Sequence, residues 1–425
     1  MRTPQMIGTP LRRAAALLLP LLLTLSVLSL NFASATPTAA IASGAIFNVP
    51  TSASSAERNA VRDRIISLVN AANPGSTIKI AMFHLWSQTV ANALANAHTD
   101  PNRQVNVQVI EDETAISDAK ADLTSYNILK TALGTDTTRS SFITLCPPTR
   151  SCLGDQTVSG IMHNKFALFS SVNGATNVVV QTSSNLTPSS YDKMWNSASV
   201  VADNIGVYNA YDWYFKRLIA KDPAAWTYAY SSSGAYKTYF FPRPGGGAAD
   251  DTIVGILDNV TCSWSDGSTA RQTVIRVAMY QLLRQAVADK LAGLQRAGCA
   301  VDVVYTRTDT GTWDALHFAG GPQMRCYNLN DDNDPNTQSL IVHSKYMLID
   351  GWYNGRHVQS VWTGSHNYTG PALTTNDEAL LKIEDSTSFS AYLGNFNTVR
   401  AAARPGTADN VTECKTLNNV GVPAT

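Results

Sequence analysis

The chain has 425 residues, and its 32 basic side chains are balanced by 32 acidic ones, so its formal net charge is zero near neutral pH. A general nucleic-acid binder is normally basic, and this balance argues against that class of protein. It does not exclude a small cleft that binds phosphate.

The first 35 residues have the pattern of a secretory signal peptide. Two adjacent arginines precede an apolar run over residues 14–30, and a small-x-small cleavage site ends at Ala35. Pro20 interrupts the run, which is short for a membrane span, so the pattern favours cleavage over an uncleaved anchor. Cleavage removes three basic residues and no acid, which leaves 29 basic and 32 acidic side chains, a net charge of −3. We therefore expect a secreted, soluble protein.

Six cysteines lie beyond the signal peptide, and an even number in an exported protein predicts disulfides. Cys146 and Cys152 bracket a short turn-rich loop, so we expect these two to pair. The other four allow three pairings among which the sequence does not choose. No cysteine has a histidine at metal-ligand spacing, and we expect the bridges to be structural. The remaining cysteines are Cys262, Cys299, Cys326 and Cys414.

After a predicted helix over residues 55–72, the chain contains one structural unit twice. The stretch that begins at Ile78 and the stretch that begins at Ile275 each read as an alternating apolar strand, an amphipathic helix and a second strand. This unit favours parallel pairing. Three aromatic positions at helical spacing also repeat, shifted by 181 residues: Tyr208, Tyr211 and Phe215 recur as Phe389, Tyr392 and Phe396.

The duplication predicts the domain organisation. We expect an N-terminal half over residues 40–242, a Gly-Pro-rich linker over 243–251, a C-terminal half over 252–415 and a tail over 416–425. The predicted fold class is α/β. Each half has a mixed or mostly parallel sheet flanked by helices, and a pseudo-two-fold axis places the active site between the halves.

Each half also contains a histidine and a lysine one residue apart. His163 and Lys165 stand in one apolar run, and His343 and Lys345 stand in another, 180 residues later. Alternate side chains of a strand share a face, so each pair points the same way. Downstream, a serine and an asparagine two residues apart again share a face, and these are Ser183, Asn185, Ser365 and Asn367.

These motifs resemble the phospholipase D superfamily, whose signature is His-x-Lys-x4-Asp followed by Gly-Ser-x-Asn once per half. The second half matches fully, with Asp350 as the aspartate. The first half departs at Ser170 and Thr182, where the family has aspartate and glycine. A further family feature, Asn-x-Glu, places Glu378 as the acid that holds one imidazole. Aligned by letters, the first half reads Asn-Ser-Ala over residues 196–198 and lacks this carboxylate.

The constellation fits phosphodiester cleavage. Lys165 and Lys345 offset the phosphate charge while Asn185 and Asn367 donate hydrogen bonds, with Ser183 and Ser365 as further donors. The resemblance implies that one histidine attacks phosphorus and the other protonates the leaving alcohol, after which water or an alcohol releases the product. By the same resemblance, we assign His163 as the nucleophile and His343 as the acid. The roles reverse if an imidazole must be oriented by a carboxylate from its own half, because the first half lacks both acids. We expect no metal and no cofactor.

Three functions remain open. The first is a secreted, monomeric phospholipase D that cleaves phosphatidylcholine-like lipids at a membrane surface. The second is an extracellular metal-independent nuclease with the same site, which the low charge disfavours. The third is a phosphate-binding protein without turnover, supported only by the incomplete first motif.

Overall fold

The repeated unit predicted from the sequence is present twice, and in each copy its two strands pair in parallel. In the first unit these elements are β2 (Thr77–Met82), α3 (Gln88–Thr99) and β3 (Asn106–Glu111), and in the second they are β14 (Val274–Leu282), α9 (Gln285–Arg296) and β15 (Ala300–Thr308). The helices bury their apolar side against the sheets, as Leu94 and Leu291 show with no exposed surface. The computed structural model describes residues 41–329 and 339–405.

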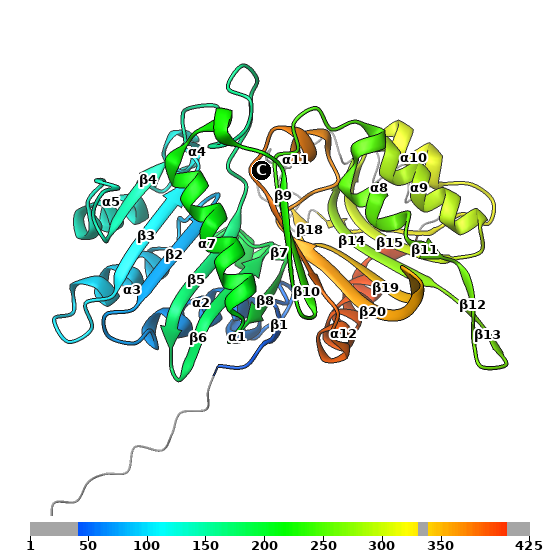
Figure 1. Cartoon of the computed structure of the whole chain (residues 1–425), viewed down its shortest axis with the longest axis horizontal. Helices are drawn as coiled ribbons and strands as arrows, with labels where there is room; N and C mark the ends of the chain where they lie inside the picture. The colour runs from blue at the N-terminus through cyan, green and yellow to red at the C-terminus, as the bar shows by residue number, and fades with distance from the viewer. Residues whose placement is uncertain (1–40, 330–338, 406–425) are drawn as a thin grey trace, which may run out of the picture. The chain divides into compact units, whose positions relative to one another are not determined.

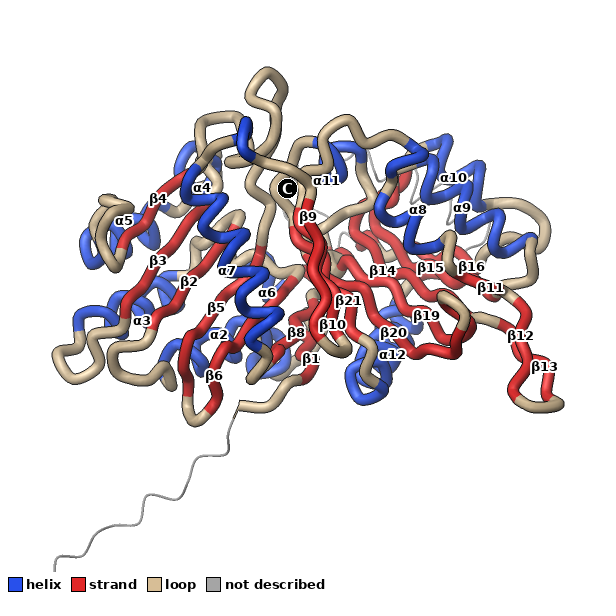
Figure 2. Tube along the Cα trace, in the orientation of Figure 1, coloured by secondary structure: helices blue, strands red, loops and turns tan. Residues whose placement is uncertain are grey.

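Each unit is part of a mixed sheet (Figures 1 and 2). The first sheet has the order β1-β8-β6-β5-β2-β3-β4, and the second has the order β22-β16-β15-β14-β19-β20-β21-β10-β9. The run β3-β2-β5-β6-β8 therefore has the same connectivity as the run β15-β14-β19-β20-β21. This agreement confirms the predicted α/β class with two similar, pseudo-symmetric halves.

The remaining strands are short or lie at the sheet edges. In the first copy they are β1 (Gly44–Phe47), β4 (Phe142–Leu145), β5 (Lys165–Val172), β6 (Ala175–Thr182), β7 (Met194–Trp195), β8 (Ser197–Val201), β9 (Ala229–Ser233) and β10 (Tyr236–Phe240). In the second copy they are β11 (Val260–Thr261), β12 (Ser263–Asp266), β13 (Thr269–Gln272), β16 (Gln323–Cys326), β17 (Asn328–Leu329), β18 (Leu340–Val342), β19 (Lys345–Tyr353), β20 (Arg356–Gly364), β21 (Ala379–Ile383) and β22 (Arg404–Pro405). The hairpin β9–β10 precedes the predicted linker but pairs with β21 of the second sheet.

Helices cover the sheets. They are α1 (Ser55–Arg58), α2 (Ala60–Asn70), α4 (Thr114–Ser117), α5 (Leu123–Leu133), α6 (Pro188–Asp192), α7 (Ile205–Ala220), α8 (Thr252–Leu257), α10 (Thr310–Leu316), α11 (Gly370–Thr374) and α12 (Ser386–Ala402), with 3-10 turns η1 (Pro223–Ala225) and η2 (Ala248–Asp250). The predicted helix over residues 55–72 is present as α1 and α2, which are separated at Asn59.

The two long helices α7 and α12 carry the repeated aromatic residues, and these side chains form the core that the two copies share. Tyr211 and Tyr392 have no exposed surface, and both belong to one hydrophobic cluster with residues from both sheets. Tyr392 shares a hydrogen bond with Ser199 of the first copy at 2.8 Å. Each helix begins at a polar cap, Asn204 for α7 and Asp385 for α12, whose side chain accepts a backbone N–H of the first turn.

The predicted bridge between Cys146 and Cys152 is formed, and Cys262 pairs with Cys299. Cys414, the predicted signal peptide and the predicted tail lie outside the described residues. Within residues 41–329 and 339–405, no helix is long and apolar enough to span a membrane.

Candidate active site

Both histidines are positioned by backbone contacts that cross from one copy to the other. His163 precedes β5, and its N–H donates to the carbonyl of Asp377 in the second copy at 2.9 Å. His343 precedes β19, and its N–H donates to the carbonyl of Trp195 in the first copy at 3.0 Å. Parallel pairing of β18 with β7 forms the second contact, and an isolated parallel bridge between Met162 and Asp377 forms the first. The fold therefore brings the two motifs together at one site.

Each imidazole is also held by a side chain of the other copy. Glu378 Oε1 lies 2.8 Å from His163 Nδ1, and Asn196 Oδ1 lies 3.0 Å from His343 Nδ1. Ser183 Oγ donates to the same amide oxygen at 2.9 Å, and the Asn196 NH₂ donates to the Ser190 carbonyl at 3.0 Å. The amide is thus oriented with its oxygen toward the ring, so Nδ1 of His343 carries the proton. In both rings this leaves Nε2 for chemistry.

This pairing shows that the sequence alignment of Asn-Ser-Ala (residues 196–198) with Asn-Asp-Glu (residues 376–378) is wrong. The backbone contacts make Trp195 equivalent to Asp377, so the counterpart of Glu378 is Asn196 and not Ala198. The first copy therefore has a hydrogen-bond acceptor at this position, but one without charge. A signal for this was present in the sequence, because Asn196 and Glu378 both stand 13 residues after the motif serine.

The two lysines lie beside the histidines in matching environments. Lys165 Nζ donates to the carbonyl of His163 at 2.9 Å, and Lys345 Nζ donates to that of His343 at 2.6 Å. The first ammonium lies 5.0 Å from the ring centre of Phe83, and the second lies 5.1 Å from that of Tyr280. These two aromatic residues are equivalent in the two copies and were not among the predicted site residues.

Burial and mutual repulsion govern the protonation of the site. Burial lowers the pKa of Lys165 to about 7, and burial followed by repulsion from Lys165 lowers the pKa of Lys345 well below its usual value. Burial and the lysines also lower the pKa of His163 and His343 well below 6.5. Burial raises the pKa of Glu378 to about 8. The site is therefore short of negative charge, which a bound phosphodiester would supply.

Of the motif asparagines and serines, Asn367 lines the pocket beside His163, and both serines bond to the chain behind it. Asn185 and Asn367 are almost fully buried, and their Oδ1 atoms have no hydrogen-bond partner within the described residues. Ser183 bonds to Asn196, and Ser365 Oγ accepts the Ala379 N–H at 3.1 Å. The serines thus hold the loop that carries the imidazole partners, which differs from the predicted role as substrate donors.

Asp350 is not at the site, contrary to its prediction as a supporting residue. Its carboxylate contacts His357 Nε2 at 3.2 Å on a partly exposed part of β19. Five residues separate it from Lys345, which is about 17 Å along an extended strand. The corresponding Ser170 accepts the Thr77 N–H at 2.8 Å. Both positions stabilise the sheet.

A pocket of about 450 Å³ opens beside the nucleophile candidate. His163 and Asn367 contribute to its wall, together with Arg307 at the end of β15 and Gln281 at the end of β14. Arg307 was not predicted from the sequence, because no motif marks it.

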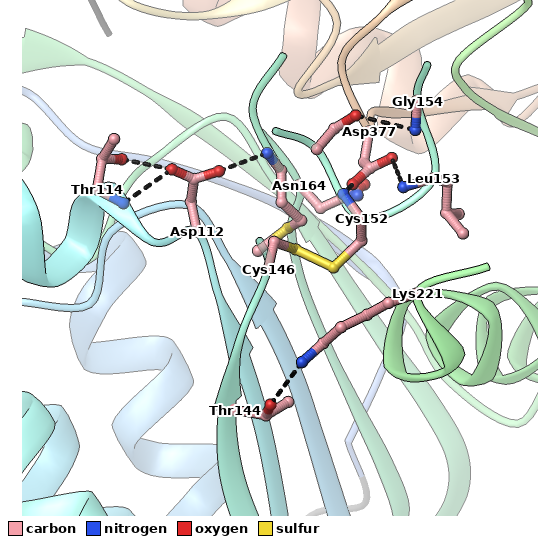
Figure 3. Close-up of a disulfide and its surroundings, with 12 residues drawn as sticks. Asp112, Thr114, Thr144, Cys146, Cys152, Leu153, Gly154, Asn164, Lys221 and Asp377 are labelled. Atoms are coloured by element: carbon pink, nitrogen blue, oxygen red, sulfur yellow. Dashed lines mark hydrogen bonds between the residues drawn. A yellow bond between two sulfur atoms is a disulfide. The ribbon is translucent and has the colours of Figure 1, made fainter. Parts of the chain in front are cut away.

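The Cys146–Cys152 bridge closes a loop that contacts the site (Figure 3). The N–H groups of Cys152 and Leu153 donate to the two oxygens of Asp377 at 2.6 and 3.1 Å. Asp377 is the neighbour of Glu378, so this loop fixes the backbone that carries the partner of His163. Cys146, Cys152 and Asp377 are close enough together to suggest a metal site, but both sulfurs are used in the bridge.

Comparisons with known proteins agree with this geometry. The family model described as "Cardiolipin synthase, PLD-like domain" matches residues 65–219 and 268–400, which together exceed half of the chain. The chain is similar to the phosphatidylserine synthase structure of Haemophilus influenzae Rd KW20, with a TM-score of 0.57 and 13% identity over 88% of this chain and 92% of that one.

It is also similar to polyphosphate kinase from Porphyromonas gingivalis, with a TM-score of 0.54 and 14% identity. That match covers 84% of this chain and 50% of the kinase, so the chain spans half the length of that protein. At these identities the two structures show a shared fold. No curated protein sequence matches the chain.

We expect sulfate, whose charge is constant near neutral and alkaline pH, to bind with proton uptake and to bind more weakly as the pH rises. Burial lowers the pKa of Lys165 and Lys345 in the empty site, and an anion raises it, so these groups gain protons on binding. Calorimetry in buffers of different ionisation enthalpy measures this uptake. The variant Lys130→Met, at an exposed position away from the site, should behave as wild type, whereas affinity that increases with pH would contradict the argument.

Of the two described disulfides, one should matter more for turnover and the other more for stability. Replacing Cys146 and Cys152 by alanine should lower kcat by about tenfold to a hundredfold, because small displacements of catalytic groups have effects of this size. Replacing Cys262 and Cys299 by alanine should leave kcat nearly unchanged. It should lower the free energy of unfolding by about 4 kcal/mol, compared with about 2 kcal/mol for the Cys146–Cys152 bridge, because the Cys262–Cys299 bridge closes a longer loop. Turnover of a soluble phosphodiester and thermal unfolding measure both. Equal kcat values for the two double variants would be evidence against a positioning role.

Proposed function

The chain belongs to the phospholipase D superfamily, through a PLD-like domain of the cardiolipin synthase type, and we propose that within this superfamily of phosphodiester-processing enzymes it is an exported phospholipase D. The reaction would convert a phospholipid and water into phosphatidate and the free head-group alcohol. Phosphatidylcholine is the substrate type expected from the sequence. The observation that carries the proposal is that two imidazoles and two ammonium groups, one pair from each copy, are buried around a site short of negative charge.

The unequal partners of the histidines support the assignment of their roles. When a neutral imidazole attacks phosphorus, the ring gains positive charge, and a carboxylate at Nδ1 stabilises that charge. His163 has such a partner in Glu378, whereas His343 has the neutral amide of Asn196. A less stabilised imidazolium gives up its proton more readily, which suits the acid that protonates the leaving alcohol.

The proposed reaction has two steps. The anionic phosphodiester raises the pKa of the imidazoles when it binds, so His343 takes up a proton from solvent at Nε2. His163 Nε2 then attacks phosphorus, the bond from phosphorus to the head-group oxygen breaks, and His343 Nε2 gives its proton to that oxygen. His343 then takes a proton from water, the water oxygen attacks phosphorus, and the bond to His163 breaks. An alcohol in place of water would give transfer of the phosphatidyl group. Lys165, Lys345 and the amides of Asn185 and Asn367 would stabilise the charge on the phosphoryl oxygens.

Export and a lipid substrate are supported by separate observations. The two described disulfides are typical of proteins in oxidising compartments. The mature net charge of −3 does not favour a long polyanion, which keeps the extracellular nuclease as the second candidate. Both copies lie in one chain, so a monomer suffices to complete the site. The intact histidine and lysine pairs disfavour a binding protein without turnover.

The nucleophile can be identified by acid-quenched trapping of phosphohistidine. We expect His343→Ala to accumulate the covalent intermediate slowly, and we expect His163→Ala to accumulate none, with turnover lowered by at least about a thousandfold in both. EDTA should leave wild-type turnover unchanged. Trapping in His163→Ala and not in His343→Ala would reverse the two roles.

Head-group release separates the candidate substrates. Purified protein incubated with phospholipid vesicles should release the head-group alcohol and form phosphatidate, and it should leave supercoiled plasmid intact. The double variant His163→Ala, His343→Ala is the control for contaminating activity. Nicking of plasmid without release of alcohol would establish the nuclease instead.

A further inference from the structure

Arg307 is a charged residue at the active-site pocket that the proposed mechanism does not use. It stands near the end of β15 and lines the same pocket as His163 and Asn367. Its side chain is half-buried, and its Nε is shielded from solvent with no hydrogen-bond acceptor among the described residues. Buried polar groups nearly always have a partner, so the Nε–H of an arginine that lines a pocket is suited to donate to an anionic group of a ligand.

The duplication makes this position informative. Met82 pairs with Glu111 in the first copy, and Met279 pairs with Tyr305 in the second. Counting two residues further on therefore aligns Arg307 with Glu113, where β3 has already ended and α4 begins. Glu113 accepts a hydrogen bond from Ser117 in its own helical turn. The charge at this position is therefore reversed between the copies, and the second copy presents a cation to the pocket.

The other residues that line the pocket indicate which chemical group it can bind. The residues that line the pocket include polar side chains such as Gln281 and Asn376, but none of them is a carboxylate, and the imidazole of His163 is the single aromatic ring among them. A quaternary ammonium is recognised by aromatic faces or acids, and here it would meet an arginine instead. A carboxylate or phosphate would meet a planar fork of N–H donors.

We infer that Arg307 binds a second anionic group of the substrate, so that the enzyme prefers phospholipids with a carboxylate or phosphate in the head group over those with choline or ethanolamine. This inference rests on the proposed function and refines it. It departs from the phosphatidylcholine-like substrate expected from the sequence. The pocket volume of about 450 Å³ is within the range of sites for small molecules, so it can hold a head group.

Phosphatidylserine and phosphatidylethanolamine test the inference, because their head groups differ only by a carboxylate. Short-chain forms below their aggregation limit avoid effects of membrane charge. We expect the wild type to have a kcat/KM about tenfold to a hundredfold higher for the serine lipid, the range for a hydrogen bond to a charged group. Arg307→Gln should remove this preference and leave kcat/KM for the ethanolamine lipid within about twofold, while Arg307→Lys should keep part of the preference.

Arg325→Gln is the matched control, since Arg325 lies on the neighbouring strand β16 and is not part of the pocket lining. It should keep the wild-type ratio. Equal kcat/KM values for the two lipids in the wild type, or an equal loss for both in Arg307→Gln, would overturn the inference while leaving the phospholipase proposal intact. Cleavage of neither lipid by the wild type would overturn the proposed function and the inference with it.

Discussion

The burial of four basic side chains around one point is the constraint on which the rest of this structure depends. His163, Lys165, His343 and Lys345 have at most 1% of their surface exposed, and Glu378 is the carboxylate that bonds to one of them. Removing charges from water is unfavourable unless they are paired, so the empty site destabilises the fold. The large apolar core around α7 and α12, built from both copies, offsets this destabilisation. The same lack of pairing prepares the site for an anionic phosphodiester without reorganisation.

The exchange of partners between the copies makes the two halves dependent on each other. An imidazole of one copy is held by a side chain and a backbone carbonyl of the other, so neither copy forms a complete site alone. Because each imidazole has its own partner, the partner in one copy can differ from the partner in the other. Replacing one carboxylate by an amide at Asn196 keeps the geometry of the ring and changes only its basicity. Two equivalent histidines can thereby take different parts in one reaction.

Sequence patterns predicted what depends on local periodicity. The strand–helix–strand units, the shared face of each histidine and lysine, and the short disulfide loop all follow from spacing along the chain. Which imidazole each partner holds does not follow from spacing, because the partner comes from the other copy through a short parallel contact. Asp350 could have been excluded, since an odd separation of five residues from Lys345 places it on the opposite face of β19. The Cys262–Cys299 pairing was undetermined because distance in sequence does not restrict it.

A duplicated active site divides its residues into two groups with different freedom to change. In the proposed mechanism, residues that recur in both copies, such as Lys165 and Lys345, contact the same phosphoryl group, so a change in either copy affects the same reaction. Residues beyond the motifs, such as Glu113 at the start of α4 and Arg307 on β15, face different surroundings in the two copies. A change there alters only one side of the substrate. We therefore expect the catalytic residues to be the same in both copies and the residues that select the substrate to differ between them. The opposite charges of Glu113 and Arg307 are such a difference.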